Sequence, residues 1–129
     1  MSPELDKKLC ENYPKIFADR YKGPQETAMC WGFECGDGWY KLLDMTCWYI
    51  QTIIDYSQDY DNPIEQVVAD QVKEKYGTLR FYVHGGNEQT DELIQLAEFM
   101  SGHTCERCGN RGKINDSGWV TVRCESCKD

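Results

Sequence analysis

The chain has 129 residues, of which 40% are hydrophobic and 12% aromatic, and its formal net charge is -8. This length fits one domain with a small appendage, and the aromatic content excludes a disordered chain. The first residues carry charges where a secretion signal needs an apolar run, and no apolar stretch approaches the length that spans a membrane. We therefore expect a cytoplasmic protein, in which close cysteine pairs bind metal instead of forming disulfides.

Near the N-terminus, Ser2 followed by a proline and an acidic residue predicts a helix start. This short helix must end before Pro14. Glycine-containing turns then predict an irregular segment over residues 18–37.

The strongest helix signal covers residues 38–57, with Asp37 placed to cap it. Residues of the predicted inner face recur there at spacings of three and four, in the series Trp39, Leu43, Thr46/Cys47, Ile50 and Ile53/Ile54. We expect this helix to lie at the centre of the core.

The next segment changes to the period of a strand. Val68 and Val72 are predicted to share one face of a first strand, and Tyr76-Gly77 forms the turn to a second strand, although residues 67–72 are also compatible with a helix. The inward-facing residues of that second strand are predicted to be Leu79, Phe81 and Val83.

A second helix is predicted over residues 88–101, ending at Gly102. The fold class expected from these elements is α+β, with two principal helices packed on a β-hairpin. We expect an acidic body over residues 1–103 and a zinc ribbon over residues 104–129.

The ribbon is predicted from four cysteines with the spacing C-x2-C-x15-C-x2-C: Cys105, Cys108, Cys124 and Cys127. This spacing is typical of a four-cysteine zinc site. So short a stretch cannot fold on its own core, whereas structural zinc contributes about 10–16 kcal/mol in comparable peptides. Because four protein ligands leave no open position, we predict one structural Zn²⁺ ion.

The other thiols and the histidines allow two further interpretations. Cys10, Cys30, Cys35 and Cys47 could form a second metal site, although Cys10 and Cys47 fall on apolar helix faces, where cysteine is usually a small buried hydrophobe. A catalytic Cys-His pair could involve the Cys30–Cys35 segment together with His84 or His103.

Three stretches then indicate a relationship: CGDGWYKLLDMTC, VVADQVKEKYGTLRFYV, and AEFMSGHTCERCGNRGK with GWVTVRC. They resemble a family of short hypothetical proteins of bacteria and phages, in which a CGDGW helix start, a QVKEKYGTLRFYV strand pair and a zinc-ribbon-like tail occur in this order. The resemblance covers roughly residues 30–127. Relatives often end in Cys-x-x-His, where this chain has Cys124 and Cys127, and either set binds zinc. The resemblance implies a fold and a setting, but no activity.

The strand pair contains the only basic cluster of the acidic body, formed by Lys73, Lys75 and Arg80. These charges either pair across the hairpin or contact a partner. The ribbon contains five Lys or Arg residues and four Asp or Glu residues, which are interleaved along its sequence. Such interleaved charges offset a zinc-thiolate centre and disfavour a phosphate-binding patch.

From these observations we predict a small acidic protein-binding module held together by zinc. It would act as a phage-type inhibitor or counter-defence protein that docks on a host protein in the host cytoplasm. One alternative is a nucleic-acid-binding regulator that uses the ribbon and the basic hairpin residues. The other alternative is a small enzyme with a Cys/His site. No membrane partner is expected.

Overall fold

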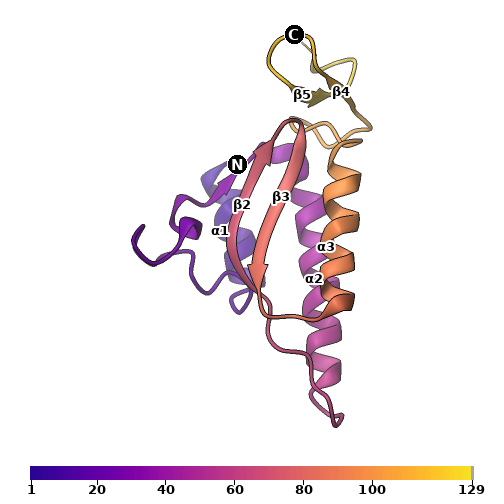
Figure 1. The fold of residues 1–129 in the computed structure, drawn as a ribbon. Helices are drawn as coiled ribbons and strands as arrows, with labels where there is room; N and C mark the ends of the chain where they lie inside the picture. The colour runs from indigo at the N-terminus through magenta and orange to yellow at the C-terminus, as the bar shows by residue number, and fades with distance from the viewer. Residues whose placement is uncertain (129) are drawn as a thin grey trace.

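Three helices, a three-stranded sheet and a separate two-stranded ribbon make up the α+β fold of the computed structural model, which describes residues 1–128 (Figure 1). The predicted limit of the ribbon at residue 129 lies outside the described residues. The helices are α1 (Pro3–Asn12), α2 (Tyr40–Ser57) and α3 (Glu88–Ser101). The strands are β1 (Phe33–Glu34), β2 (Val68–Lys75), β3 (Thr78–His84), β4 (Lys113–Asn115) and β5 (Thr121–Arg123).

Helix α1 begins as predicted, because the Ser2 hydroxyl accepts a hydrogen bond from the backbone N–H of Leu5 at 3.4 Å. The helix buries Leu9 and Cys10 against the rest of the protein. It also buries Asp6, which forms an ion pair of 3.0 Å with Arg20. Arg20 in turn donates to the carbonyl of Cys30 at 2.9 Å, so this pair fixes the segment that follows α1.

That segment is less irregular than predicted. It contains a 3₁₀ turn over Ala28–Trp31 and the short strand β1, which pairs in parallel with β2 through Phe33 and Val72. The sequence interpretation missed β1 because two residues show no strand period. Phe33 then packs in the core against the ring of Phe17, with centroids 4.8 Å apart.

Helix α2 confirms the predicted central helix, and it buries Leu43, Cys47, Ile50 and Ile54. The predicted cap is wrong. Asp37 lies in a 3₁₀ turn (Asp37–Trp39) before the helix, and its carboxylate accepts from the N–H of Ser2 at 2.7 Å. This turn delays the helix start to Tyr40, so Asp37 faces the N-terminal segment instead of the first turn of α2.

The β-hairpin is confirmed, with Tyr76 and Gly77 as its two turn residues. Both have positive φ, of 54° and 83°, as a two-residue turn between twisted strands requires. Leu79 and Phe81 are buried as predicted. A bulge between Ala69 and Gln71 shifts the alternation of β2, so that Ala69, and not Val68, is buried along with Val72.

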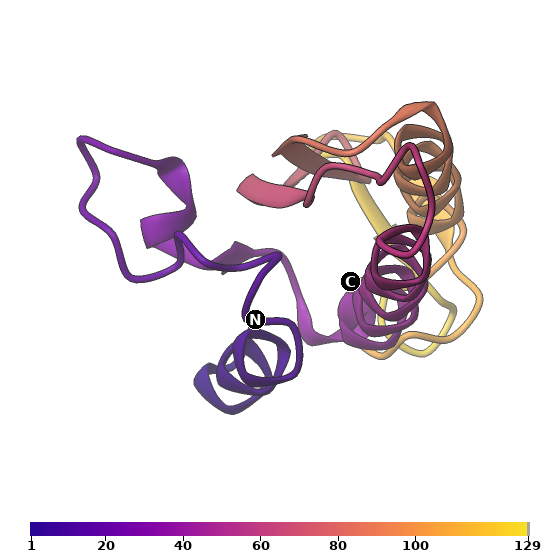
Figure 2. The same cartoon turned by 90° about the horizontal axis from the view of Figure 1, so that it is seen from below.

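Helix α3 has the predicted bounds and is capped at its start by Asn87 and Thr90. It runs beside the free edge of β3, where two of its side chains bind backbone N–H groups. The Ser101 hydroxyl accepts from Leu79 at 2.8 Å, and the Glu98 carboxylate accepts from Phe81 at 3.0 Å. Figure 2 shows α1 and α2 on the same side of the sheet and α3 next to α2. Within residues 1–128, no helix is both long and apolar enough to cross a membrane.

Candidate metal centre and the surfaces around it

The four ribbon cysteines come together, and their sulfur atoms all lie within 4.8 Å of one another. The sulfurs of Cys108 and Cys124 are 3.6 Å apart. An ion held tetrahedrally by four thiolates at about 2.3 Å would separate the sulfurs by about 3.8 Å. The four residues, Cys105, Cys108, Cys124 and Cys127, could therefore hold a metal ion.

Local backbone geometry explains why these residues converge. The first pair turns back at Gly109, which has φ 83° and donates its N–H to the carbonyl of Cys105 at 2.9 Å. The second pair makes the equivalent turn, since the N–H groups of Cys127 and Lys128 donate to the carbonyl of Cys124. Pairing of β4 with β5 brings the two turns to the same end of the ribbon.

The thiols of the cluster differ in acidity. Burial raises the pKa of Cys105, but hydrogen bonds from the backbone N–H groups of Cys108, Cys124 and Arg107 outweigh burial and lower this pKa to about 6. Hydrogen bonds with Cys124 and Cys108 instead raise the pKa of Cys127 to about 12. Close thiols thus share protons, and metal binding would release them because thiolates are the ligands.

The ribbon is attached to the body through the CGDGW segment that precedes α2. The N–H of Gly38 donates to the carbonyl of Glu106 at 2.7 Å, and the N–H of Gly36 donates to the Glu106 carboxylate at 2.8 Å. The indole of Trp39 donates to the carbonyl of Thr104 at 2.9 Å. We call these three hydrogen bonds the clamp.

The clamp explains both glycines of the motif. A Cβ on Gly38 would overlap the Cys105 carbonyl oxygen, and a Cβ on Gly36 would overlap the Glu106 carbonyl oxygen. Sequence reasoning assigned these glycines only to a turn. The close approach of residues about seventy positions apart leaves no local signal in the sequence.

The remaining cysteines do not form a second cluster. Among residues 1–128, only the four ribbon cysteines group as metal ligands. Burial raises the pKa of the thiols of Cys10 and Cys35 to about 12, and burial also raises the pKa of Cys47. Such thiols have little thiolate character, so they are poor nucleophiles.

The two histidines lie in unrelated places. His84 is exposed and its Nδ1 is 2.7 Å from a carboxylate oxygen of Asp70. His103 lies against the ring of Phe99, with centroids 5.1 Å apart. No hydrogen bond described for residues 1–128 joins His84 or His103 to Cys30 or Cys35, as the predicted Cys-His site would require.

The basic hairpin residues lie at the end of the hairpin that faces the ribbon. Lys73 and Arg80 are partners across the two strands, and Arg80 also donates to the Thr78 hydroxyl at 2.6 Å. Lys73 and Lys75 line a cavity of about 320 Å³ whose opposite wall is the ribbon loop at Trp119. Their role in partner binding stays a prediction.

A second surface was not predicted from the sequence. On the side of α2 and α3 away from the sheet, a shallow apolar groove of about 180 Å³ runs between the helices. We call it the helical groove, and it is lined by Leu42, Met45, Thr46, Tyr49, Leu93, Leu96, Ala97 and Met100. The sequence interpretation had assigned the apolar residues of both helices to the core alone.

Comparison of the chain with protein-family models, with curated protein sequences and with solved structures gives no match.

Proposed function

We propose that this protein is a binding module that docks on another protein through the helical groove, and that a Zn²⁺ ion at the four cysteines has a structural role. The observation that carries the proposal is an exposed apolar groove between two helices whose segments are rich in acidic residues. Large exposed apolar surfaces on a folded domain usually mark sites of interaction.

The groove is made of side chains that the fold of this chain leaves exposed. Met45 is 55% exposed and Leu96 is 54% exposed. Each helix carries a second apolar stripe beside its buried one, at spacings of three and then four residues: Leu42, Met45 and Tyr49 on α2, and Leu93, Leu96 and Met100 on α3. Paired stripes of this kind receive a third helix in helix-in-groove recognition. Two methionines in the lining make the groove adaptable.

The charge of the two segments that form the groove indicates the chemistry of the partner. Residues 40–67 and 85–103, which comprise both helices and their adjoining loops, contain one Lys and nine Asp or Glu residues. Segments of this composition repel acidic partners and attract basic ones. The occupant we propose is therefore an amphipathic helix with a basic polar face, carried by a partner protein.

The metal centre supports the same function indirectly. Four protein thiolates leave no open coordination position, which is the arrangement of structural zinc sites. Zinc and iron both accept four thiolates, and we favour zinc because the paired Cys-x-x-Cys turns are those of a zinc ribbon. Its binding energy, about 10–16 kcal/mol in comparable peptides, would fold a ribbon that has little core of its own.

The setting that fits this module is the one that the sequence resemblance implies. A small acidic protein of phage type would occupy a basic surface of a bacterial host protein and act as an inhibitor or counter-defence protein. The groove gives that proposal a specific contact surface.

The test uses a labelled model helix of leucine and lysine, with a leucine–glutamate helix of the same pattern as control. We expect fluorescence anisotropy to detect binding of the basic helix and not of the acidic one. Leu96→Glu should weaken binding at least tenfold, because it puts a charge in the groove. Since this change also makes the protein more acidic, a purely electrostatic contact would instead become tighter.

Tyr21→Glu is the matched control variant, because Tyr21 is an exposed apolar residue outside the groove. It adds the same charge and should leave binding nearly unchanged. Equal or tighter binding of the basic helix by Leu96→Glu would overturn the proposal. Protein partners captured from a bacterial lysate after nuclease treatment should likewise be lost with Leu96→Glu and kept with Tyr21→Glu.

A further inference from the structure

The ribbon end of the molecule differs in charge from the rest of the chain. The hairpin tip and the ribbon, residues 73–80 and 104–128, hold eight Lys or Arg residues and four Asp or Glu residues. The rest of the described chain holds six Lys or Arg residues and 17 Asp or Glu residues. Four zinc-bound thiolates lower the charge of the basic end by only two. The fold thus gathers basic residues from two segments that are distant in the sequence at one end of the molecule.

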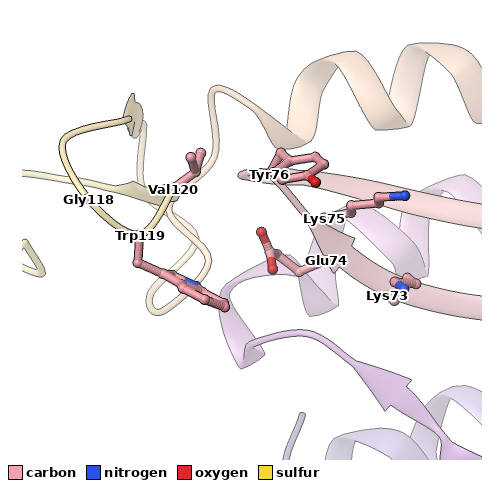
Figure 3. A pocket seen from close by; sticks show the side chains of 7 residues that line it. All are labelled: Lys73, Glu74, Lys75, Tyr76, Gly118, Trp119 and Val120. Atoms are coloured by element: carbon pink, nitrogen blue, oxygen red, sulfur yellow. The ribbon is translucent and has the colours of Figure 1, made fainter.

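The cavity between the hairpin tip and the ribbon lies within this basic end (Figure 3). We call it the hairpin–ribbon pocket, and it is lined by Lys73, Glu74, Lys75, Tyr76, Gly118, Trp119 and Val120. Its volume of about 320 Å³ falls in the range of small-ligand sites. One wall is an aromatic residue of the ribbon, and the other wall is the end of β2.

Trp119 is the most exposed of the large hydrophobic residues within residues 1–128, with 85% of its surface accessible. It lies on the loop between β4 and β5, where Gly118 has φ 89°, and Figure 3 shows its indole directed toward Glu74. Trp119 also lines a second, polar cavity of about 610 Å³ on the ribbon side, together with Arg123 and Lys128. An indole between two cavities, both lined by cations, offers a surface on which a planar ring can stack.

Glu74 gives the pocket a hydrogen-bond acceptor. One of its carboxylate oxygens accepts from the N–H of Gly77 at 2.7 Å, and this bond holds the side chain beside the hairpin turn. Figure 3 shows the carboxylate directed toward the side of the pocket where Trp119 lies. No hydrogen bond described for residues 1–128 uses the other oxygen, which can accept from an amino group.

The second cavity contains a cation whose hydrogen bonding is incomplete. Arg123 has a side chain only 15% exposed and lies 3.6 Å from Glu106, and its Nε has no hydrogen-bond partner among the described residues. The Glu106 carboxylate is committed to Gly36 in the clamp. Arg123 also adds positive charge to the wall of this cavity.

We propose that the hairpin–ribbon pocket binds one base of a single-stranded nucleic acid. The base stacks on Trp119 and donates its exocyclic amino group to Glu74. The flanking phosphates contact Lys73 and Lys75 on one side, and Arg123 and Lys128 on the other. Stacking on an aromatic side chain beside cations is the usual way in which proteins hold single strands.

This assignment makes a prediction about base identity. Cytosine, adenine and guanine carry an exocyclic amino group, whereas thymine and uracil present only carbonyl acceptors and one ring N–H. A carboxylate accepts from the amino group of cytosine and is repelled by the carbonyl at the same position of thymine. Oligo(dC) is therefore expected to bind more tightly than oligo(dT). The pocket holds a splayed-out base, so a duplex should not compete.

The experiment measures anisotropy of labelled 12-mers of dC, dT and rC with the zinc-loaded full chain. Wild-type protein should bind dC and rC in preference to dT. The logarithm of the dC affinity should fall with the logarithm of salt concentration with a slope of about -2, as expected if about three phosphates are neutralised. Trp119→Ala should lower the dC affinity roughly ten- to hundredfold, and Trp119→Phe should restore part of it.

Trp31→Ala is the matched control, because Trp31 is also a well-exposed tryptophan, at 64%, and lies in the 3₁₀ turn before β1. It should leave the affinity unchanged. Glu74→Gln should narrow the preference for dC over dT, because an amide can donate to a thymine carbonyl.

Equal binding of dC and dT by the wild type, or equal effects of Trp119→Ala and Trp31→Ala, would overturn the proposal. Absence of any binding of the 12-mers at 50 mM salt would also overturn it. If a captured protein partner were instead lost on changing Trp119→Ala, the pocket would be assigned to protein recognition.

These outcomes are separable from those of the helical groove. Trp119→Ala should leave binding of the basic model helix unchanged, and Leu96→Glu should leave the preference for dC unchanged. Failure of one proposal therefore does not affect the other.

Discussion

Replacing Gly38 by alanine is expected to detach the ribbon from the body. The added Cβ would overlap the Cys105 carbonyl oxygen and lie 2.6 Å from the carbonyl oxygen of Glu106. Both obstacles are backbone atoms of the first cysteine pair, so no side-chain rotation can relieve the overlap. The ribbon must move away, and the clamp must open.

The cost can be worked out from the hydrogen bonds of the clamp. The bonds from Gly38 to Glu106 and from Trp39 to Thr104 are neutral and contribute about 1 kcal/mol each. The bond from Gly36 to the Glu106 carboxylate involves a charge and contributes about 2 kcal/mol. Loss of part or all of the clamp should therefore lower the free energy of unfolding by about 2–4 kcal/mol.

The assay is urea denaturation of the zinc-loaded protein, followed by far-ultraviolet circular dichroism. Gly23→Ala is the matched control, because a Cβ added to Gly23 would have no neighbouring atom within 4 Å and the φ of Gly23 is not positive. It should change stability by less than about 0.5 kcal/mol. If Gly38→Ala differed from Gly23→Ala by less than that amount, the clamp would not be the attachment that the contacts indicate.

Two further predictions concern the thiols. Replacing Cys105 by serine should abolish stoichiometric zinc binding, measured by metal analysis after gel filtration. In the wild type, exchange of zinc for Co²⁺ should give the visible absorption of a tetrahedral thiolate site. A wild type that retained neither metal would contradict the structural zinc proposal. The free energy of unfolding should also fall as the pH rises from about 9 toward 12. Burial raises the pKa of Cys10 and Cys35 from 9.0 to about 12 in the folded protein. The unfolded chain therefore loses these thiol protons at a lower pH than the folded protein does, and deprotonation favours unfolding. Urea midpoints at pH 7.5 and 10 check this, and Cys35→Ala should flatten the dependence; an unchanged slope in that variant would contradict the buried-thiol explanation.

Elements defined by local chemistry were predicted well from the sequence. The bounds of α3, the turn at Tyr76-Gly77 and the grouping of the ribbon cysteines all depend on residues close together in the chain or on a strict spacing. The Ser2 cap is of the same kind. Each of these signals is contained within about twenty residues, so the sequence alone carries it.

What the sequence did not reveal depends on long-range contact. Strand β1 exists because β2 offers it a partner, and the cap assigned to Asp37 failed because the clamp and α1 determine the course of the chain there. The helical groove was missed because a single helix cannot show which of two apolar stripes is covered. The hairpin–ribbon pocket likewise needs Glu74 and Trp119 placed side by side, which no spacing rule could supply.

The side chains that α3 extends to the edge of the sheet have a consequence for solubility. A free strand edge is a template on which another chain can add a strand, and long exposed edges promote aggregation. Here Ser101 and Glu98 occupy the outward N–H groups of Leu79 and Phe81, so β3 has fewer donors to offer a passing strand. One helix thus contributes both a surface of the helical groove and protection of the sheet against unwanted self-association.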